Sequence, residues 1–273
     1  MIAIITDSSS NITQEEARAL GVTVLPLTII FGTEEYRDGI DIDSAEFFKK
    51  LTTGKDFPHT AQLTETQVKE AVVAAKSRAD EVLILPISSA LSGSYDRCVK
   101  VAEKYDGVYA YDGKCTTVML KMLTLIALKN ANKPAKEVIK ILSDYRRRMK
   151  LYAALNTLEY LGKGGRISRT MATLGNALKI KPVVTLNDDG EVELVSKQFG
   201  MNKSIAYIAE QVKKDEIDYS EPVIVIYAMT EENSDRLIEK IGSPYFEKSE
   251  ICAVIATHIG PHAAGFVYVK KPN

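Results

Sequence analysis

The chain has 273 residues, and a hydrophobic core rarely grows beyond about 250–300 residues, so two domains are expected. The 35 basic and 36 acidic residues leave a formal net charge of −1, which does not indicate a nucleic-acid-binding surface. No signal-peptide pattern opens the chain, and no apolar run reaches the roughly 18 residues of a membrane-spanning helix. The three scattered cysteines fit neither a disulfide framework nor a zinc site. We therefore expect a cytoplasmic protein with no membrane insertion and no metal.

The first half of the chain alternates apolar runs with helical patterns. Capping-box sequences at Thr13 with Glu16 and at Thr64 with Gln67 predict two helix starts. Strands are predicted at residues 2–5, 22–31, 81–87 and 108–111, and helices at 13–20, 43–51, 64–79, 94–105, 115–130 and 134–148. This alternation predicts a mostly parallel sheet covered by helices.

The second half is less regular, so we place a domain boundary near residue 150. Asn187 to Gly190 predicts the turn of a hairpin. Strands are predicted at 151–156, 182–186, 191–197, 222–228, 251–256 and 266–270, and helices at 171–178, 203–214 and 231–241. Residues 163–166 are predicted to form a turn.

The strongest local signal is the loop from Ser88 to Ser94, between a buried strand and a helix. Open α/β sheets bind ligands at this edge, and a helix start suits a phosphate or a carboxylate. Ser92 and Ser94 can donate hydroxyl hydrogen bonds, and Gly93 lets the backbone approach a ligand closely. The structural alternative is that Ser92 is only a helix N-cap.

Other segments are weaker candidates. Asp7, in the loop after the first strand, is either a ligand group or, as we favour, a hydrogen-bond acceptor for loop backbone. His258 follows the predicted strand 251–256, where it is either a site residue or a structural histidine. Residues 163–166 do not form a Walker A loop, and no GxGxxG sequence is present, so nucleotide binding is not indicated.

Five segments, taken in order, resemble the DegV family of fatty-acid-binding proteins, which includes the binding subunits of bacterial fatty acid kinase. They are Thr6-Asp7-Ser8-Ser9, residues 88–95 (SSALSGSY), residues 158–168 (LEYLGKGGRIS), residues 178–182 (LKIKP) and residues 257–261 (THIGP).

The resemblance implies a two-domain α/β fold. Residues 1–150 form a Rossmann-like domain that carries the carboxylate-binding loops, and residues 151–273 form a mixed α/β domain with the lipid tunnel and the His258 loop. A long-chain fatty acid is the ligand, no cofactor is needed, and the binding protein is not itself an enzyme. Its partner is an ATP-dependent fatty acid kinase subunit. The implied carboxylate ligands are Thr60, Ser92, Gly93 and His258, with Ser94 and Arg166 supporting them or facing the partner.

The chain departs from the family pattern at Ala61, Leu63, Gly113, Phe199 and His262. Two alternatives stay open, and the departures at Ala61, Phe199 and His262 leave room for the second of them. One is an acyl hydrolase with Ser92 as nucleophile and His258 as base, although the loop is not a GxSxG elbow. The other is a regulatory protein that binds a different lipid or small anion.

Overall fold

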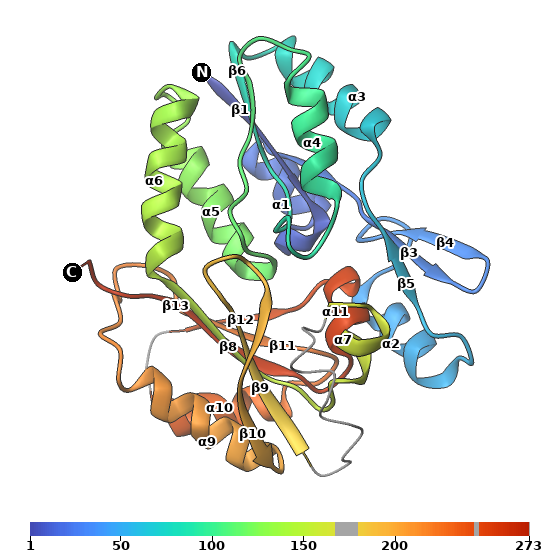
Figure 1. Ribbon diagram of the computed structural model, residues 1–273, viewed down its shortest axis with the longest axis vertical. Helices are drawn as coiled ribbons and strands as arrows, with labels where there is room; N and C mark the ends of the chain where they lie inside the picture. Colours follow the sequence, from blue (N-terminus) through green and yellow to red (C-terminus); the bar gives the residue numbers. More distant parts are fainter. Residues whose placement is uncertain (167–179, 243–245, 273) are drawn as a thin grey trace. The chain divides into compact units, whose positions relative to one another are not determined.

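The computed structural model describes residues 1–166, 180–242 and 246–272 (Figure 1). The chain divides into two compact units. Unit 1 comprises Met1–Arg147 with Cys252–Val254, and unit 2 comprises Arg148–Ile251 with Ile255–Asn273. The predicted helix 171–178 falls outside the described residues.

Unit 1 is built on a four-stranded parallel sheet in the order β2-β1-β6-β7. Its central strands β1 and β6 are almost continuously apolar and buried, as is typical of parallel strands covered on both faces. Figure 1 shows α5 and α6 on one side of β1 and β6, and α3 and α4 on the other. The elements of this sheet and its cover are β1 (Ile2–Asp7), η1 (Ser8–Ser10), α1 (Gln14–Leu20), β2 (Thr23–Leu25), α3 (Glu65–Lys76), β6 (Glu81–Leu85), α4 (Ser94–Ala102), β7 (Val108–Ala110), α5 (Thr117–Lys129) and α6 (Ala135–Arg148).

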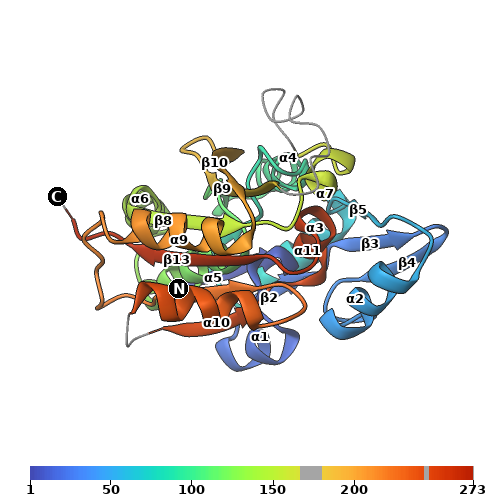
Figure 2. The same cartoon turned by 90° about the horizontal axis from the view of Figure 1, so that it is seen from below.

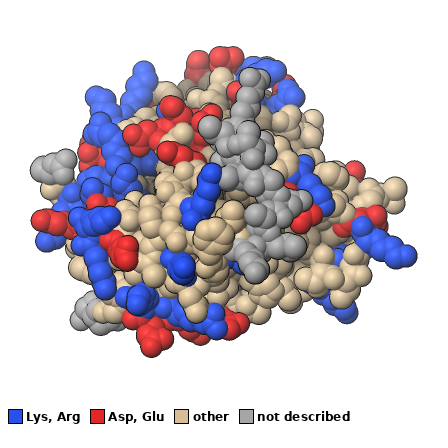
Figure 3. All heavy atoms as spheres, turned by 60° about the horizontal axis from the view of Figure 1, so that its bottom comes forward, with Lys and Arg blue, Asp and Glu red and all other residues tan. Residues whose placement is uncertain are grey.

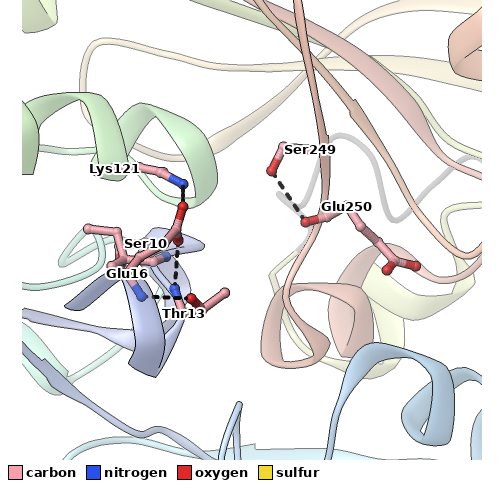
Figure 4. Close-up of polar contacts among 7 residues, drawn as sticks. Ser10, Thr13, Glu16, Lys121, Ser249 and Glu250 are labelled. Atoms are coloured by element: carbon pink, nitrogen blue, oxygen red, sulfur yellow. Dashed lines mark hydrogen bonds and ion pairs between the residues drawn. The ribbon is translucent and has the colours of Figure 1, made fainter. Parts of the chain in front are cut away.

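Both predicted capping boxes are confirmed. The Thr13 hydroxyl accepts from the Glu16 N–H, and the Glu16 carboxylate accepts from the Thr13 N–H, at the start of α1. The same exchange joins Thr64 and Gln67 at α3. Glu16 also accepts a 2.6 Å bond from Lys121 of α5 (Figure 4), so one side chain both caps α1 and ties it to a second helix.

The prediction of a single strand at 22–31 is wrong, because the chain changes sheets at Pro26. β2 ends before the proline, whereas β3 (Thr28–Phe31) belongs to a separate antiparallel sheet in the order β4-β3-β5. Proline offers no N–H to a strand ladder, and the N–H of Leu27 donates instead to the Ser8 hydroxyl at 3.1 Å. The other elements here are β4 (Glu34–Arg37), α2 (Ser44–Thr53) and β5 (His59–Ala61).

Unit 2 is built on a mixed six-stranded sheet in the order β10-β9-β8-β13-β11-β12. α9 and α10 pack together against it (Figure 2), and α9 contributes apolar side chains at helical spacing, namely Ile205, Ile208, Ala209 and Val212. The predicted hairpin is confirmed as β9 and β10. The elements are β8 (Met149–Ala154), α7 (Glu159–Lys163), β9 (Ile180–Leu186), β10 (Val192–Phe199), α9 (Met201–Val212), β11 (Ile224–Tyr227), α10 (Glu232–Ile241), β12 (Glu247–Glu250), α11 (Ala253–Ile259) and β13 (Ala264–Val269). The predicted α/β class, with a parallel N-terminal sheet and a mixed C-terminal sheet, is thus confirmed.

The predicted strand at 251–256 is also wrong, because this segment begins helix α11. Periodicity cannot distinguish a strand from a helix in so short an apolar run. Acceptors from remote parts of unit 1 bind the N–H groups at the helix start. The Asn11 amide oxygen accepts from Cys252 at 3.1 Å, and the Asp38 carboxylate accepts from Ala253 and Val254.

Asp38 is 2% exposed and is held by the Ser8 hydroxyl as well as by the two backbone N–H groups. Burial raises its pKa to about 7, and the neighbouring charge of Asp7 adds to the increase, whereas the hydrogen bonds oppose it. The folded protein therefore holds a proton on Asp38 at pH values where the unfolded chain does not.

The Asp38 pKa predicts a pH dependence of stability. Because the folded-state pKa is about 7 and the ordinary value is 3.8, the stabilisation that protonation provides is complete below pH 3.8 and is lost as the pH rises through 7. Asp38→Asn should remove this contribution. In urea unfolding at about pH 5.5 and about pH 8, the wild-type free energy of unfolding should fall more steeply with pH than that of the variant.

Asp41→Asn is the control, because Asp41 is exposed and its hydrogen bonds with Arg37 lower its pKa to about 2, far outside this window. Equal pH slopes for the wild type and Asp38→Asn would contradict the assignment.

Candidate functional site

Polar residues follow the neighbouring parallel strands β1 and β6, whose register pairs Thr6 with Leu85. Asp7 lies at the end of β1 and is fully buried. It accepts from the Ile87 N–H at 2.8 Å and from both the N–H and the hydroxyl of Ser9. Burial raises the pKa of Asp7, while these hydrogen bonds lower it. Asp7 therefore joins the ends of the two strands, which supports its structural role.

The Ser88–Ser94 loop folds back on its own first residue. The Ser92 N–H donates to the Ser88 carbonyl at 3.1 Å, and the Ala90 N–H donates to the Ser88 hydroxyl at 3.3 Å. The Ser89 hydroxyl donates to Asp112 at 2.5 Å. The N-cap of α4 is Gly93 and not Ser92, although the Ser92 hydroxyl accepts from the N–H of Ser94, the first residue of this helix.

Ser92 is oriented by Ser94, which is fully buried. The Ser94 hydroxyl accepts from the Leu63 N–H at 3.1 Å and lies 3.0 Å from the Ser92 hydroxyl. The Ser92 hydroxyl also accepts from the Ser94 N–H at 3.2 Å. A serine hydroxyl has one donor and two acceptor sites. If Ser94 donates to Ser92, both Ser92 acceptor sites are filled and its O–H hydrogen points to no acceptor among the described residues.

The segment that contains Thr60 contacts the Ser92–Ser94 turn. Thr60 lies in β5, opposite Ile29 of β3, and the chain then runs through Leu63 to α3. Besides the Leu63–Ser94 bond, a Cβ on Gly93 would collide with the side chain of Gln62. Glycine at residue 93 therefore leaves room for the amide group of the Gln62 side chain, which is a different close approach from the one that we predicted.

A pocket of about 390 Å³ lies beside α4 and Gln62. Four of its lining residues are charged, namely Asp96, Arg97, Lys100 and Glu103. Apolar tails bind in pockets lined mainly by apolar side chains, so this pocket does not suit a hydrocarbon.

Arg166 and His258 lie in unit 2, whereas Thr60, Ser92, Gly93 and Ser94 lie in unit 1. His258 is in the last turn of α11, not in a loop after a strand as predicted. Arg166 follows α7, donates from Nη1 to the Gly164 carbonyl, and has its pKa lowered by burial. Sequence analysis did not single out three residues whose contacts the structure shows to be close: Asp38, which is buried, and Gly164 and Gly260, which lie against the rings of His258 and Tyr160. The paired glycines of residues 164–165 were the available signal for Gly164, but they indicated only a turn.

The described residues do not support a reactive thiol, a metal site or a membrane-spanning helix. Cys98 and Cys115 are fully buried, and burial raises the pKa of both thiols, to about 12 for Cys115, so neither is a reactive thiolate. The described residues contain no cluster of three or more metal-ligating side chains. None of their helices combines the length and apolarity needed to cross a bilayer. Figure 3 shows acidic and basic side chains side by side on one face.

Comparison with known proteins places these segments in a family. The model of the DegV family, described as "Uncharacterised protein, DegV family", matches residues 1–271. A DegV domain-containing protein of Caldanaerobacter subterraneus subsp. tengcongensis is 32% identical over 279 residues, covering 99% of each chain.

Solved structures agree. A DegV family protein from Thermus thermophilus, described by its fatty acid binding, has a TM-score of 0.89 at 29% identity, over 99% of each chain. DegV from Bacillus subtilis, described as a fatty acid binding protein, has a TM-score of 0.86 at 26% identity, again over 99% of each chain. From the family match and these relatives, the chain belongs to the DegV family.

Proposed function

We propose that this protein binds one long-chain fatty acid and holds its carboxylate at the Ser92–Ser94 turn. Family membership and the fatty acid binding described for the Thermus and Bacillus relatives support the ligand class. Thr60 and Gly93 belong to the two contacting segments and complete the proposed carboxylate site in unit 1.

The observation that carries the proposal is the Ser92 hydroxyl. It accepts from the Ser94 N–H and shares a second hydrogen bond with the Ser94 hydroxyl, in which either oxygen can be the donor. When Ser94 donates, both acceptor sites of Ser92 are filled and its own hydrogen is left to donate to a ligand. A carboxylate only accepts hydrogen bonds, and the N-terminus of α4, which lacks a side-chain cap, adds a partial positive charge. A half-buried donor at this place suits a single anionic group.

The tail contributes most of the affinity. Each buried methylene contributes about 0.8 kcal/mol, so a tail of about 14 methylenes contributes on the order of 11 kcal/mol before the entropic cost of binding. One hydrogen bond to the charged head contributes roughly 1.5–3 kcal/mol. The head group thus fixes the orientation of the ligand more than it sets the affinity. For the tail we propose a tunnel contributed by unit 2.

The family resemblance also suggests a partner. We propose that an ATP-dependent fatty acid kinase subunit phosphorylates the bound carboxylate to an acyl phosphate, as the family resemblance implies. The sequence supplies no Walker A or GxGxxG motif of its own, which fits a division of labour in which the partner binds ATP. We propose His258 as a further carboxylate ligand, and Arg166 as a supporting or partner-facing cation.

Ser92→Ala should raise the dissociation constant for palmitate by about tenfold, because one charge-assisted hydrogen bond is lost. The dissociation constant for methyl palmitate should change little, because that ester carries no anionic head. Calorimetry on delipidated protein with both ligands measures the difference.

Ser89→Ala provides the matched control for Ser92→Ala. The Ser89 hydroxyl belongs to the same loop but is exposed and bound to Asp112. Its loss should leave the palmitate affinity unchanged. An equal loss of affinity for the acid and the ester in Ser92→Ala would exclude the proposed role.

Ser94→Ala should act on stability as well as on binding. It leaves the buried Leu63 N–H without its acceptor, which costs about 1–3 kcal/mol. The half-buried Ser92 hydroxyl, in contrast, bonds only within its own turn, to the N–H and the hydroxyl of Ser94. In urea unfolding, the midpoint should therefore fall further for Ser94→Ala than for Ser92→Ala, and the reverse order would contradict the assigned roles.

Protein purified from its native source should carry a fatty acid that mass spectrometry detects in the organic extract. Protein that contains no lipid and takes up neither palmitate nor oleate would refute the proposal. Steady hydrolysis of acyl esters that disappears in Ser92→Ala would instead support the hydrolase alternative.

A further inference from the structure

In unit 2, the segment of α7 and the end of α11 are interlocked by two aromatic rings that each lie against a glycine. The imidazole of His258 lies against Gly164, and the ring of Tyr160 lies against Gly260. The two contacts run in opposite directions, since each segment supplies one ring and one glycine. Together they hold the His258 side chain and the backbone two residues after it.

Gly164 admits the imidazole only because it has no Cβ. A Cβ built there would collide with Nδ1 of His258 and would lie 3.1 Å from Cε1. Gly164 has an ordinary helical φ of −75°, so its backbone conformation does not require glycine. The space for a side chain is instead taken mainly by the His258 ring, and the Tyr160 carbonyl oxygen, 3.0 Å from the built Cβ, narrows it further.

Gly260 makes the reciprocal contact. Its Cβ would collide with the Tyr160 ring, lying 2.9 Å from Cγ. Here the φ of +73° also favours glycine, so conformation and space act together. Burial raises the pKa of Tyr160, with the charge of Glu159 adding to the effect.

Gly164 also forms a hydrogen bond with Arg166, a second candidate site residue. Its N–H donates to the Tyr160 carbonyl at 2.9 Å, and its own carbonyl accepts from Nη1 of Arg166. One residue therefore contacts His258 through its Cα and Arg166 through its carbonyl oxygen.

We infer that Gly164 is a positioning residue that sets the orientation of the His258 imidazole and of the Arg166 guanidinium. The importance of this orientation for the fatty-acid carboxylate rests on the proposed function. Packed interiors accommodate an added methyl group only by displacing a neighbour. Since the backbone of Gly164 is fixed in a helical turn, the His258 ring must move.

Gly164→Ala tests this, with Gly162→Ala as the matched control. Gly162 is exposed, belongs to the same helix and has nothing within 4 Å of a built Cβ. The chain has only three histidines, so ¹⁵N-histidine spectra are simple and His258→Asn assigns the His258 signals. In delipidated protein, Gly164→Ala should shift the ring resonances of His258 and leave those of His59 and His262 unchanged. Gly162→Ala should shift none.

The second contact has its own control. Gly260 and Gly242 share a φ of +73°, but only Gly260 faces a ring. Gly260→Ala should therefore displace the His258 signals while Gly242→Ala does not. Adding Tyr160→Ala to Gly260→Ala removes the obstructing ring and should restore the folding stability of the double variant toward that of Tyr160→Ala alone.

The affinity for palmitate is the last quantity to measure. Gly164→Ala should raise the dissociation constant for palmitate by about two- to tenfold, the effect of one misplaced hydrogen bond, and Gly162→Ala should not. Identical His258 spectra in Gly164→Ala and wild type would overturn the inference, whatever the affinity. Shifted His258 signals in a protein that binds no fatty acid would uphold the positioning role and refute the proposed function instead.

Discussion

The polar architecture of unit 1 depends on one requirement: a buried backbone N–H group needs an acceptor. Short polar side chains supply these acceptors where strands and helices meet loops. Ser94 accepts from Leu63, and Asp7 accepts from Ile87. Asn11 accepts from Cys252 in the same way. Most hydroxyl and carboxyl groups in these loops are therefore committed to the fold. The Ser92 hydroxyl differs, because its hydrogen bonds stay within its own turn, to the N–H and the hydroxyl of Ser94.

The same requirement places two carboxyl groups in the interior. Asp7 and Asp38 are both nearly inaccessible to solvent, and burial raises the pKa of each. The N–H and hydroxyl donors around them offset part of the cost of burying a charge. Burial therefore favours the protonated form of both carboxyl groups in the folded protein, whereas the serine hydroxyls of the Ser92–Ser94 turn do not ionise.

In unit 2, close packing of rings against glycines positions the candidate residues, whereas in unit 1 hydrogen bonds do so. Gly164 and Gly260 contribute no side chain, yet each one admits the ring of a residue from the opposite segment. Close packing between residues 158–166 and residues 257–261 therefore depends on the absence of a side chain at one position in each segment. This mutual fit gives a physical reason for Gly164 and Gly260, in two segments that sequence analysis connected only by resemblance.

Local contacts made much of the fold predictable. The capping boxes at Thr13 and Thr64 join residues three apart, and the β9–β10 hairpin joins neighbouring strands. The local sequence was therefore sufficient to predict these features. The alternation of apolar runs likewise predicted the parallel sheet of unit 1. The Ser88–Ser94 loop stood out because hydroxyls and a glycine followed a buried strand.

What the sequence alone determined were features that arise from residues close together in the chain. Tertiary structure decided the rest. Pro26 splits one predicted strand between two sheets, and residues 253–259 become a helix whose first N–H groups bind Asp38. The Leu63–Ser94 bond and the seating of His258 against Gly164 also join distant segments. Such acceptors and contacts exist only once the chain has folded, because no local pattern of residues specifies which remote side chain will satisfy a buried group.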